Sequence, residues 1–144
     1  AEALNEYYSD PASAPADGIR WAIDQVRSRA GMPGLDETFR NRGWVLNQEN
    51  VRKFIQNERR VEFAFEEHRF WDIRRWMIGT QTQREAHELD ITLKDDDLTK
   101  VYKSRKFENR IYEDHMNLMP IPQSEINKNS NLVQNWGWSP KQVN

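Results

Sequence analysis

NQENVRKFIQNERRVEFAFEEHRFWDIRRWMI, residues 47–78, contains neither glycine nor proline, and its periodicity predicts the central helix of the chain. Asn47 is a suitable N-cap, and Glu49 places a negative charge in the first turn, where the helix dipole favours it. We expect a bend or break near Glu67 and His68, because a straight helix ending only at Gly79 would exceed most globular helices in length. Six apolar residues fall on one side of this helix: Val51, Phe54, Ile55, Phe65, Ile73 and Trp76.

Charged residues fall on that same side of the predicted helix. The carboxylates at positions 58, 62 and 66 follow a helical spacing that could serve a metal site or acid–base catalysis. A helical metal site usually adds a histidine three residues after a glutamate, and His68 stands at the wrong offset. Arginines are available instead, so we favour a structural network of ion pairs. The residues assigned to this network are Glu58, Arg59, Glu62, Glu66, Arg69 and Arg74.

Composition limits the class of protein. The 144 residues suit one domain, and a hydrophobic content of 37% with 11% aromatic residues indicates a core built largely from rings. The net charge of −2 argues against nucleic-acid binding, and the absence of cysteine excludes disulfides and thiolate metal sites. No apolar stretch reaches the roughly 20 residues of a membrane helix. The chain opens on AEALNEYY rather than on methionine, so we expect it to be part of a longer protein.

The segment before the central helix predicts two helices and a loop. Residues 1–8 are expected to be the end of a helix, which the turn-forming segment SDPASAPAD follows. Asp17 is expected to cap the next helix, and Gly31 to end it. Residues 32–43 are expected to form a loop. The second helix shows Trp21 on the face opposite its apolar stripe, which consists of Ile19, Ala22, Ile23, Val26 and Ala30.

The second half of the chain predicts strands. Residues 88–93 alternate apolar and polar side chains, which is typical of a half-buried strand, and an acidic turn follows at residues 95–97. Further strands are expected at residues 99–102, 107–112 and 116–119. A short helix is expected at residues 123–128, after the Pro-Ile-Pro segment, which favours an extended backbone.

No set of residues predicts catalysis or a metal site. The chain lacks nucleophile-elbow, Walker and GxGxxG patterns, and its three histidines, at positions 68, 87 and 115, show no metal-binding spacing. An EF-hand register that starts at Asp95 fails, because Lys100 stands where glycine is required and Lys106 where a bidentate glutamate is required.

The tryptophans are the remaining candidates for a function. Trp44, which follows Gly43 in the predicted loop, is the candidate ligand-binding residue, because exposed rings can stack on sugar faces and on other apolar planes. The alternative reading is that the Trp44 ring closes a small core. Trp71 and Trp76 are core candidates.

Three segments, in this order, resemble one protein family. ALNE, followed after a proline-rich gap by IRWAIDQVRSRAGMPGL, then NERRVEFAFEEHRFWDIRRW, then LMPIPQSEINKNSNLVQNWGW are similar to the C-terminal part of the SusD/RagB family. The resemblance implies a mainly α fold with short β-strands, which contains tetratricopeptide-like helix pairs. Residues 1–144 would then form a single C-terminal region from which the upstream repeat helices are missing. The family ending commonly has a proline where this chain has Trp136.

The resemblance also implies a function. Family members are lipoproteins that an N-terminal lipid anchors to the outer membrane of Bacteroidetes, where they face outward. They bind oligosaccharides or other nutrients without cleaving them and pass them to a SusC-like TonB-dependent transporter. The resemblance therefore implies carbohydrate binding in polysaccharide utilisation, with no enzyme activity and no cofactor. It transfers no binding residue, because family ligand sites usually lie in loops outside these motifs.

Two other classes of protein stay open from the residues alone. A glycoside hydrolase would place two essential carboxylates in a cleft, so the surroundings of Glu58, Glu62 and Glu66 distinguish it from a binding protein. A helical adaptor would instead dock a protein partner, and its exposed aromatic side chains would form one flat patch.

Overall fold

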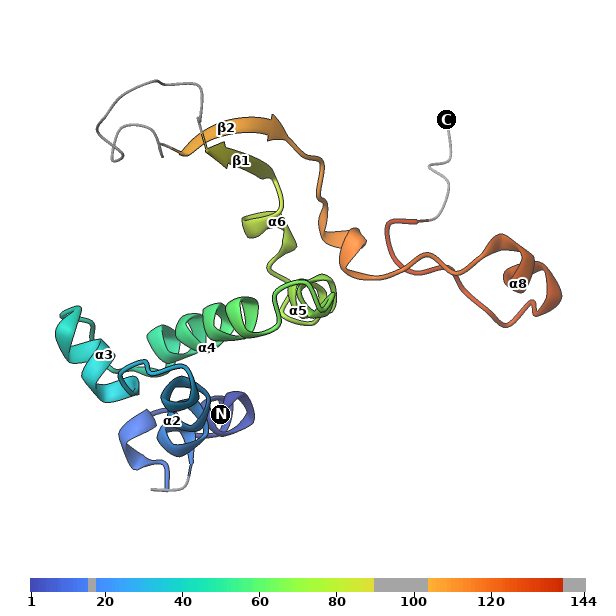
Figure 1. Ribbon diagram of the computed structural model, residues 1–144. Helices are drawn as coiled ribbons and strands as arrows, with labels where there is room; N and C mark the ends of the chain where they lie inside the picture. The colour runs from blue at the N-terminus through green and yellow to red at the C-terminus, as the bar shows by residue number, and fades with distance from the viewer. Residues whose placement is uncertain (16–17, 90–103, 139–144) are drawn as a thin grey trace. The chain divides into compact units, whose positions relative to one another are not determined.

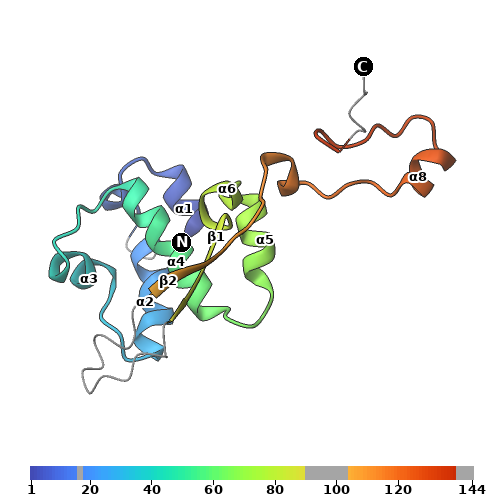
Figure 2. The same ribbon diagram turned by 90° about the horizontal axis from the view of Figure 1, so that it is seen from above.

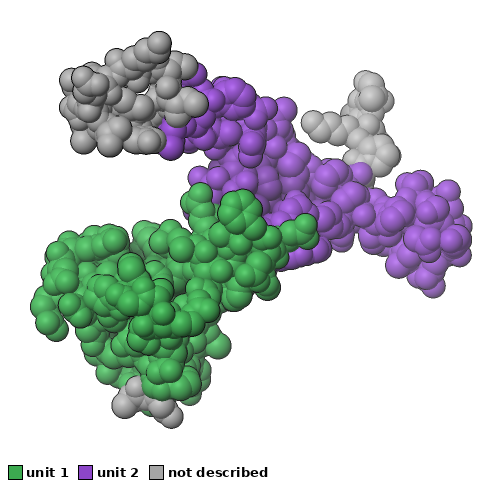
Figure 3. Space-filling model, viewed as in Figure 1, with its two compact units in different colours: residues 1–69 green, residues 70–144 purple. Residues whose placement is uncertain are grey.

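The computed structural model describes residues 1–15, 18–89 and 104–138 (Figure 1). The chain divides into two compact units, residues 1–69 and residues 70–144, which Figure 3 shows in different colours. Helices predominate and a two-stranded sheet accompanies them, so the predicted class, mainly α with short β-strands, is confirmed. None of the described helices is both long enough and apolar enough to cross a membrane.

The first unit is helical. Its elements are α1 (Glu2–Tyr7), η1 (Pro11–Ser13), α2 (Ile19–Arg29), α3 (Leu35–Asn41) and α4 (Gln48–Glu62). The short α1, which confirms the helix expected in residues 1–8, lies against α4 (Figure 2). Seven buried side chains from α2, α3 and α4 form the core of this unit: Ile19, Ile23, Leu35, Phe39, Val51, Phe54 and Ile55.

The ends of α2 are largely as predicted. The helix ends at Arg29, and Gly31 adopts the left-handed conformation with a φ of 67°, which confirms it as the stop. Gly18 occupies the N-cap position and offers no side chain to the first turn. The predicted cap, Asp17, lies outside the described residues.

The apolar stripe of α2 is buried only at its N-terminal end. Ile19 and Ile23 are buried, and Trp21 on the opposite face is 55% exposed, as the periodicity predicts. Val26 is 38% exposed and Ala30 is also exposed, so the last two turns of the stripe are not core. These two residues line the edge of a groove instead.

The prediction that residues 32–43 form a loop is wrong, because they contain α3. Its amphipathic pattern is short, with Leu35, Thr38 and Phe39 buried at helical spacing. Gly34 stands at the N-cap position, so the segment lacks a capping side chain of its own. Asp24 of α2 supplies the cap, and its Oδ1 accepts a hydrogen bond of 2.7 Å from the backbone nitrogen of Leu35. A cap from another helix leaves no local sequence signal.

α4 begins as predicted and the predicted break follows it. The side chain of Asn47 accepts a hydrogen bond of 2.8 Å from the backbone nitrogen of Asn50. The helix ends at Glu62, and Phe65 and Glu67 have positive φ values of 67° and 63°. Because the helix has ended, residues after Glu62 no longer follow its 100° spacing. Phe65 is fully exposed, so its assignment to the buried stripe is wrong.

α5 (His68–Arg75) ends before the residue predicted to stop it. Met77 has a φ of 55°, and the nitrogen of Ile78 donates to the oxygen of Ile73, which is the hydrogen-bond pattern of a Schellman motif. Gly79 therefore does not end α5 but starts α6 (Gly79–Thr82). Glycine is required at position 79 for a different reason: a Cβ there would lie 2.0 Å from the ring of Tyr112.

The sheet in residues 70–144 is an antiparallel pair. β1 (Glu85–Leu89) pairs with β2 (Ser104–Asn109), and a register shift interrupts the pairing between Ala86 and His87. Cross-strand ion pairs join Glu85 to Lys106 and Glu88 to Arg105. The predicted strand at 88–93 is described only to Leu89. The strand predicted at 99–102 and the acidic turn at 95–97 lie outside the described residues.

The segment after β2 differs in part from its prediction. β2 starts before the predicted strand 107–112 and ends within it. Residues 116–119 were expected to be a strand, but η2 (Asp114–Asn117) includes the first two of them, so this prediction is wrong. The short helix expected at 123–128 is confirmed as α8 (Gln123–Lys128).

The last described residues fold back on residues 115–121. Nε1 of Trp138 donates to the carbonyl oxygens of His115 and Leu118, at 3.1 and 3.0 Å. The amide of Gln134 bonds to both the nitrogen and the oxygen of Ile121, as a neighbouring strand would. Trp136, which stands where the family commonly has proline, is 71% exposed. Hydrogen bonds to backbone groups thus hold Gln134 and Trp138 against residues 115–121.

Arg27 joins three helices of the first unit. Its side chain is 5% exposed, and its guanidinium donates to the oxygen of Pro33 at 2.5 Å and to Oγ1 of Thr38 at 3.0 Å. It also pairs with the carboxylate of Glu58 on α4, at 2.6 Å, and its Cζ lies 5.1 Å from the ring centroid of Phe54. A buried cation needs such partners, because an unpaired charge in the interior is costly.

Replacing Arg27 with alanine should lower the free energy of unfolding by about 3 kcal/mol, because it leaves the buried partners of the arginine unsatisfied. Arg29 provides a matched control, since it pairs with Glu62 but its own side chain is 69% exposed. The Arg29→Ala variant should lose less than about 1 kcal/mol. Urea unfolding of the full-length variants measures both changes, and equal losses would contradict the bracing role of Arg27.

Candidate functional site

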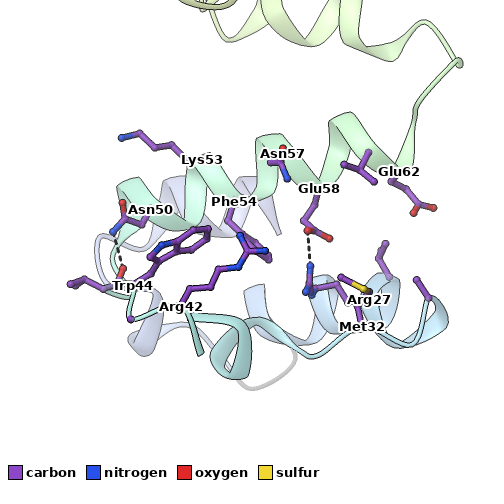
Figure 4. Close-up of a pocket in the computed structure, with 15 residues that line it drawn as sticks. Arg27, Met32, Arg42, Trp44, Asn50, Lys53, Phe54, Asn57, Glu58 and Glu62 are labelled. Carbon is purple, nitrogen blue, oxygen red and sulfur yellow. Dashed lines mark hydrogen bonds and ion pairs between the residues drawn. The ribbon is translucent and has the colours of Figure 1, made fainter. Parts of the chain in front are cut away.

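A groove of about 860 Å³ opens on the surface of the first unit. One wall is a face of α4, and the other is formed by the segments that follow α2 and α3 (Figure 4). In Figure 4, Trp44 lies near one end of the groove, Phe54 near the middle and Met32 toward the other end, and Arg42 and Val26 also line it. The volume falls within the range of about 300–1,000 Å³ that is usual for small-molecule sites.

Two similar turns place the bulky side chains on the second wall. After α3, Gly43 has a φ of 63°, its nitrogen donates to the oxygen of Arg40, and the nitrogen of Trp44 donates to the oxygen of Phe39. This is a Schellman motif, in which the residue after the glycine packs on the last turn of the helix. Gly31 and Met32 repeat the same backbone pattern after α2. Each turn thus directs one large apolar side chain to the groove.

Trp44 is held from two sides and keeps an open surface. The edge of its ring meets Phe39, with centroids 5.6 Å apart and an interplanar angle of 88°. The Cζ of Arg42 lies over the indole, 4.7 Å from its centroid. Trp44 nevertheless stays 45% exposed. Trp44 thus contacts the core residue Phe39 and stays partly exposed in the groove, and its role as a ligand-binding residue stays a prediction.

Polar side chains of α4 face Trp44 across the groove. Asn50 donates a hydrogen bond of 2.9 Å to the oxygen of Val45, which ties the loop to the helix. Asn57 lies two turns further along the same face and points between the two walls in Figure 4. Lys53 also lines the groove, but its amine pairs with Glu49 at 2.7 Å, and this pairing lowers the pKa of the Glu49 carboxyl.

Two of the three carboxylates singled out in the sequence have arginine partners from α2. Glu58 and Glu62 both line the groove, and they pair with Arg27 and Arg29. Neither arginine belongs to the predicted network, because the sequence shows the charges on each helix but not which helices meet. Glu66 is exposed.

Of the three arginines of the predicted network, two lie over aromatic rings. The Cζ of Arg59 lies 5.0 Å from the ring centroid of Phe63, and that of Arg74 lies 3.6 Å from that of Phe70. Arg69 is half-buried. The grouping of all six charged residues into one network stays a prediction.

Other sequence candidates do not join the groove. Trp71 is 60% exposed, so its assignment to the core is wrong for the described structure, and Trp76 is half-buried. Arg42 and Met32 line the groove but were not predicted, although each stands beside a glycine that ends a helix.

Among residues 1–15, 18–89 and 104–138, no group of three or more histidine, aspartate or glutamate side chains is placed to hold a metal ion.

Comparisons with known proteins agree on one family. A sequence profile described as the SusD family matches residues 1–138. Among solved structures, the chain is similar to a SusD-like protein from Bacteroides fragilis, with 36% identity and a TM-score of 0.66. That match covers 85% of this chain and 22% of the other, so this chain spans about a fifth of the length of its solved relative. No protein with a curated description matches.

Gly43→Ala should lower the free energy of unfolding by about 1 kcal/mol, because alanine is strained at a φ of 63°. No other strain is expected, since no atom lies within 4 Å of the position of the new Cβ. Gly43→Asn should lose less, because asparagine tolerates the left-handed conformation. Urea unfolding of the full-length variants distinguishes them. Wild-type stability for the alanine variant would contradict the strain expected at this position.

Proposed function

Because the chain belongs to the SusD family, we propose that this protein captures a nutrient without chemically altering it. The proposed nutrient is an oligosaccharide or another glycan, and the proposed partner is a SusC-like TonB-dependent transporter that receives it. The proposed location is the outer face of the outer membrane, with attachment through an N-terminal lipid. The observation that carries this proposal is the family match over residues 1–138, with 36% identity to a SusD-like structure.

The surroundings of the carboxylates support binding over hydrolysis. A glycoside hydrolase needs one carboxyl group that can give a proton and a second that can act as base or nucleophile. Glu58 and Glu62 do line a groove, but each is engaged by an arginine. Glu58 in particular pairs with a buried arginine that also holds α3 in place. These pairs support a structural role for both carboxylates.

Affinity electrophoresis of the full-length protein against a panel of polysaccharides tests the proposal. We expect at least one polysaccharide to retard the protein, and we expect no shorter products when the same polysaccharide is incubated with it. A protein of similar size and charge that binds no glycan serves as the control. Release of shorter products without any retardation would instead identify a carbohydrate-cleaving enzyme.

A further inference from the structure

We propose that the groove of the first unit binds an anionic saccharide, with a sugar ring against Trp44 and a carboxylate or sulfate on the guanidinium of Arg42. This inference rests on the proposed function and specifies the class of ligand. Trp44, Arg42, Asn50 and Asn57 are the residues that carry it, and all four line the groove (Figure 4).

Arg42 is a cation without an ionic partner among the described residues. Its guanidinium lies over the indole of Trp44 and extends into the groove in Figure 4, and no described carboxylate pairs with it. Stacking on a ring leaves the N–H groups at the rim of the guanidinium available. Those groups form a planar fork that matches the two oxygens of a carboxylate, or two oxygens of a sulfate.

The other cations that line the groove are neutralised. Arg27 pairs with Glu58, and Lys53 pairs with Glu49. The carboxylates of the groove are likewise engaged, since Glu62 pairs with Arg29. The uncompensated charge therefore lies at the Trp44 end, and it is positive. A neutral sugar could only accept hydrogen bonds from this guanidinium through its hydroxyl groups, whereas an anionic sugar would also form an ion pair with it.

The wall opposite Trp44 has the chemistry that sugar hydroxyl groups need. Asn50 and Asn57 lie on the same face of α4 and present amides, which both donate and accept hydrogen bonds. Asn50 uses one amide hydrogen for the oxygen of Val45 and keeps its other groups for a ligand. An aromatic ring on one side and amides on the other suit a sugar ring, which has apolar faces and polar edges.

The site is formed before the ligand arrives. The turn at Gly43 fixes the backbone of Arg42 and Trp44, and Phe39 holds the edge of the indole. Preformed side chains lose little conformational freedom on binding, so more of the contact energy appears as affinity.

Four variants of the full-length protein test the inference: Arg42→Gln, Trp44→Ala, and the matched controls Arg40→Gln and Trp21→Ala. Arg40 and Trp21 are exposed and do not line the groove. The ligands are two pairs whose members share a sugar backbone and differ in charge, polygalacturonate with its fully methyl-esterified form and dextran sulfate with dextran. Affinity electrophoresis gives the dissociation constants, and thermal melting verifies that each variant is folded.

The wild-type protein should bind the charged member of at least one pair more tightly than the neutral member. Arg42→Gln should weaken binding to the charged member about fivefold more than to the neutral member, the value of one exposed ion pair. Trp44→Ala should weaken binding to both members, and the two controls should match the wild type. If Arg42→Gln behaves as Arg40→Gln does on both pairs, or if the wild type prefers the neutral members, the inference is overturned. If the wild type binds no polysaccharide of a wider panel, the proposed function fails as well.

Discussion

The buried side chain of Arg27 makes the contacts on which the arrangement of helices in the first unit depends. It starts in the last turn of α2, reaches the loop before α3 and the interior of α3, and ends on a carboxylate of α4. The apolar core alone is small, with seven buried side chains, of which only Phe39 and Phe54 are aromatic, fewer rings than the composition predicts. A cation with several directional partners fixes the relative positions of three short helices more sharply than apolar packing of that size does. The groove lies beside the same elements, and Arg27 is one of the residues that line it.

The sequence predicted those parts of the fold that local signals encode. Asn47 and the helical period located α4, and Gly31 located the end of α2. α3 was missed because its N-terminus is capped by Asp24, a residue of a different helix. Phe65 was placed on the buried stripe because a constant angle per residue was assumed, and two left-handed residues in the following turn break that assumption. The errors therefore arise where a distant residue or a turn overrides the local period.

The residues that line the groove were predicted only in part. Trp44 was identified from its position after a glycine, and the structure places it in a groove. Arg42 was not identified, although a helix that ends in Arg-Gly-Trp carries the signal of a Schellman turn with a large residue behind it. The partners of Glu58 and Glu62 could not be read from the sequence, because ion pairs between helices depend on which faces meet. Family membership, by contrast, was evident from three ordered segments, and the profile match confirms it.

The paired turns after α2 and α3 have a consequence for how such a protein can evolve. Met32 and Trp44 each occupy the position after a left-handed glycine, where the backbone is held by its own hydrogen bonds. Their side chains lie on the wall of the groove and outside the set of buried core residues. Selection can therefore exchange either side chain and reshape the groove, while the glycines and the core keep the scaffold intact. This separation allows the shape of the groove to differ between relatives that retain the same helices.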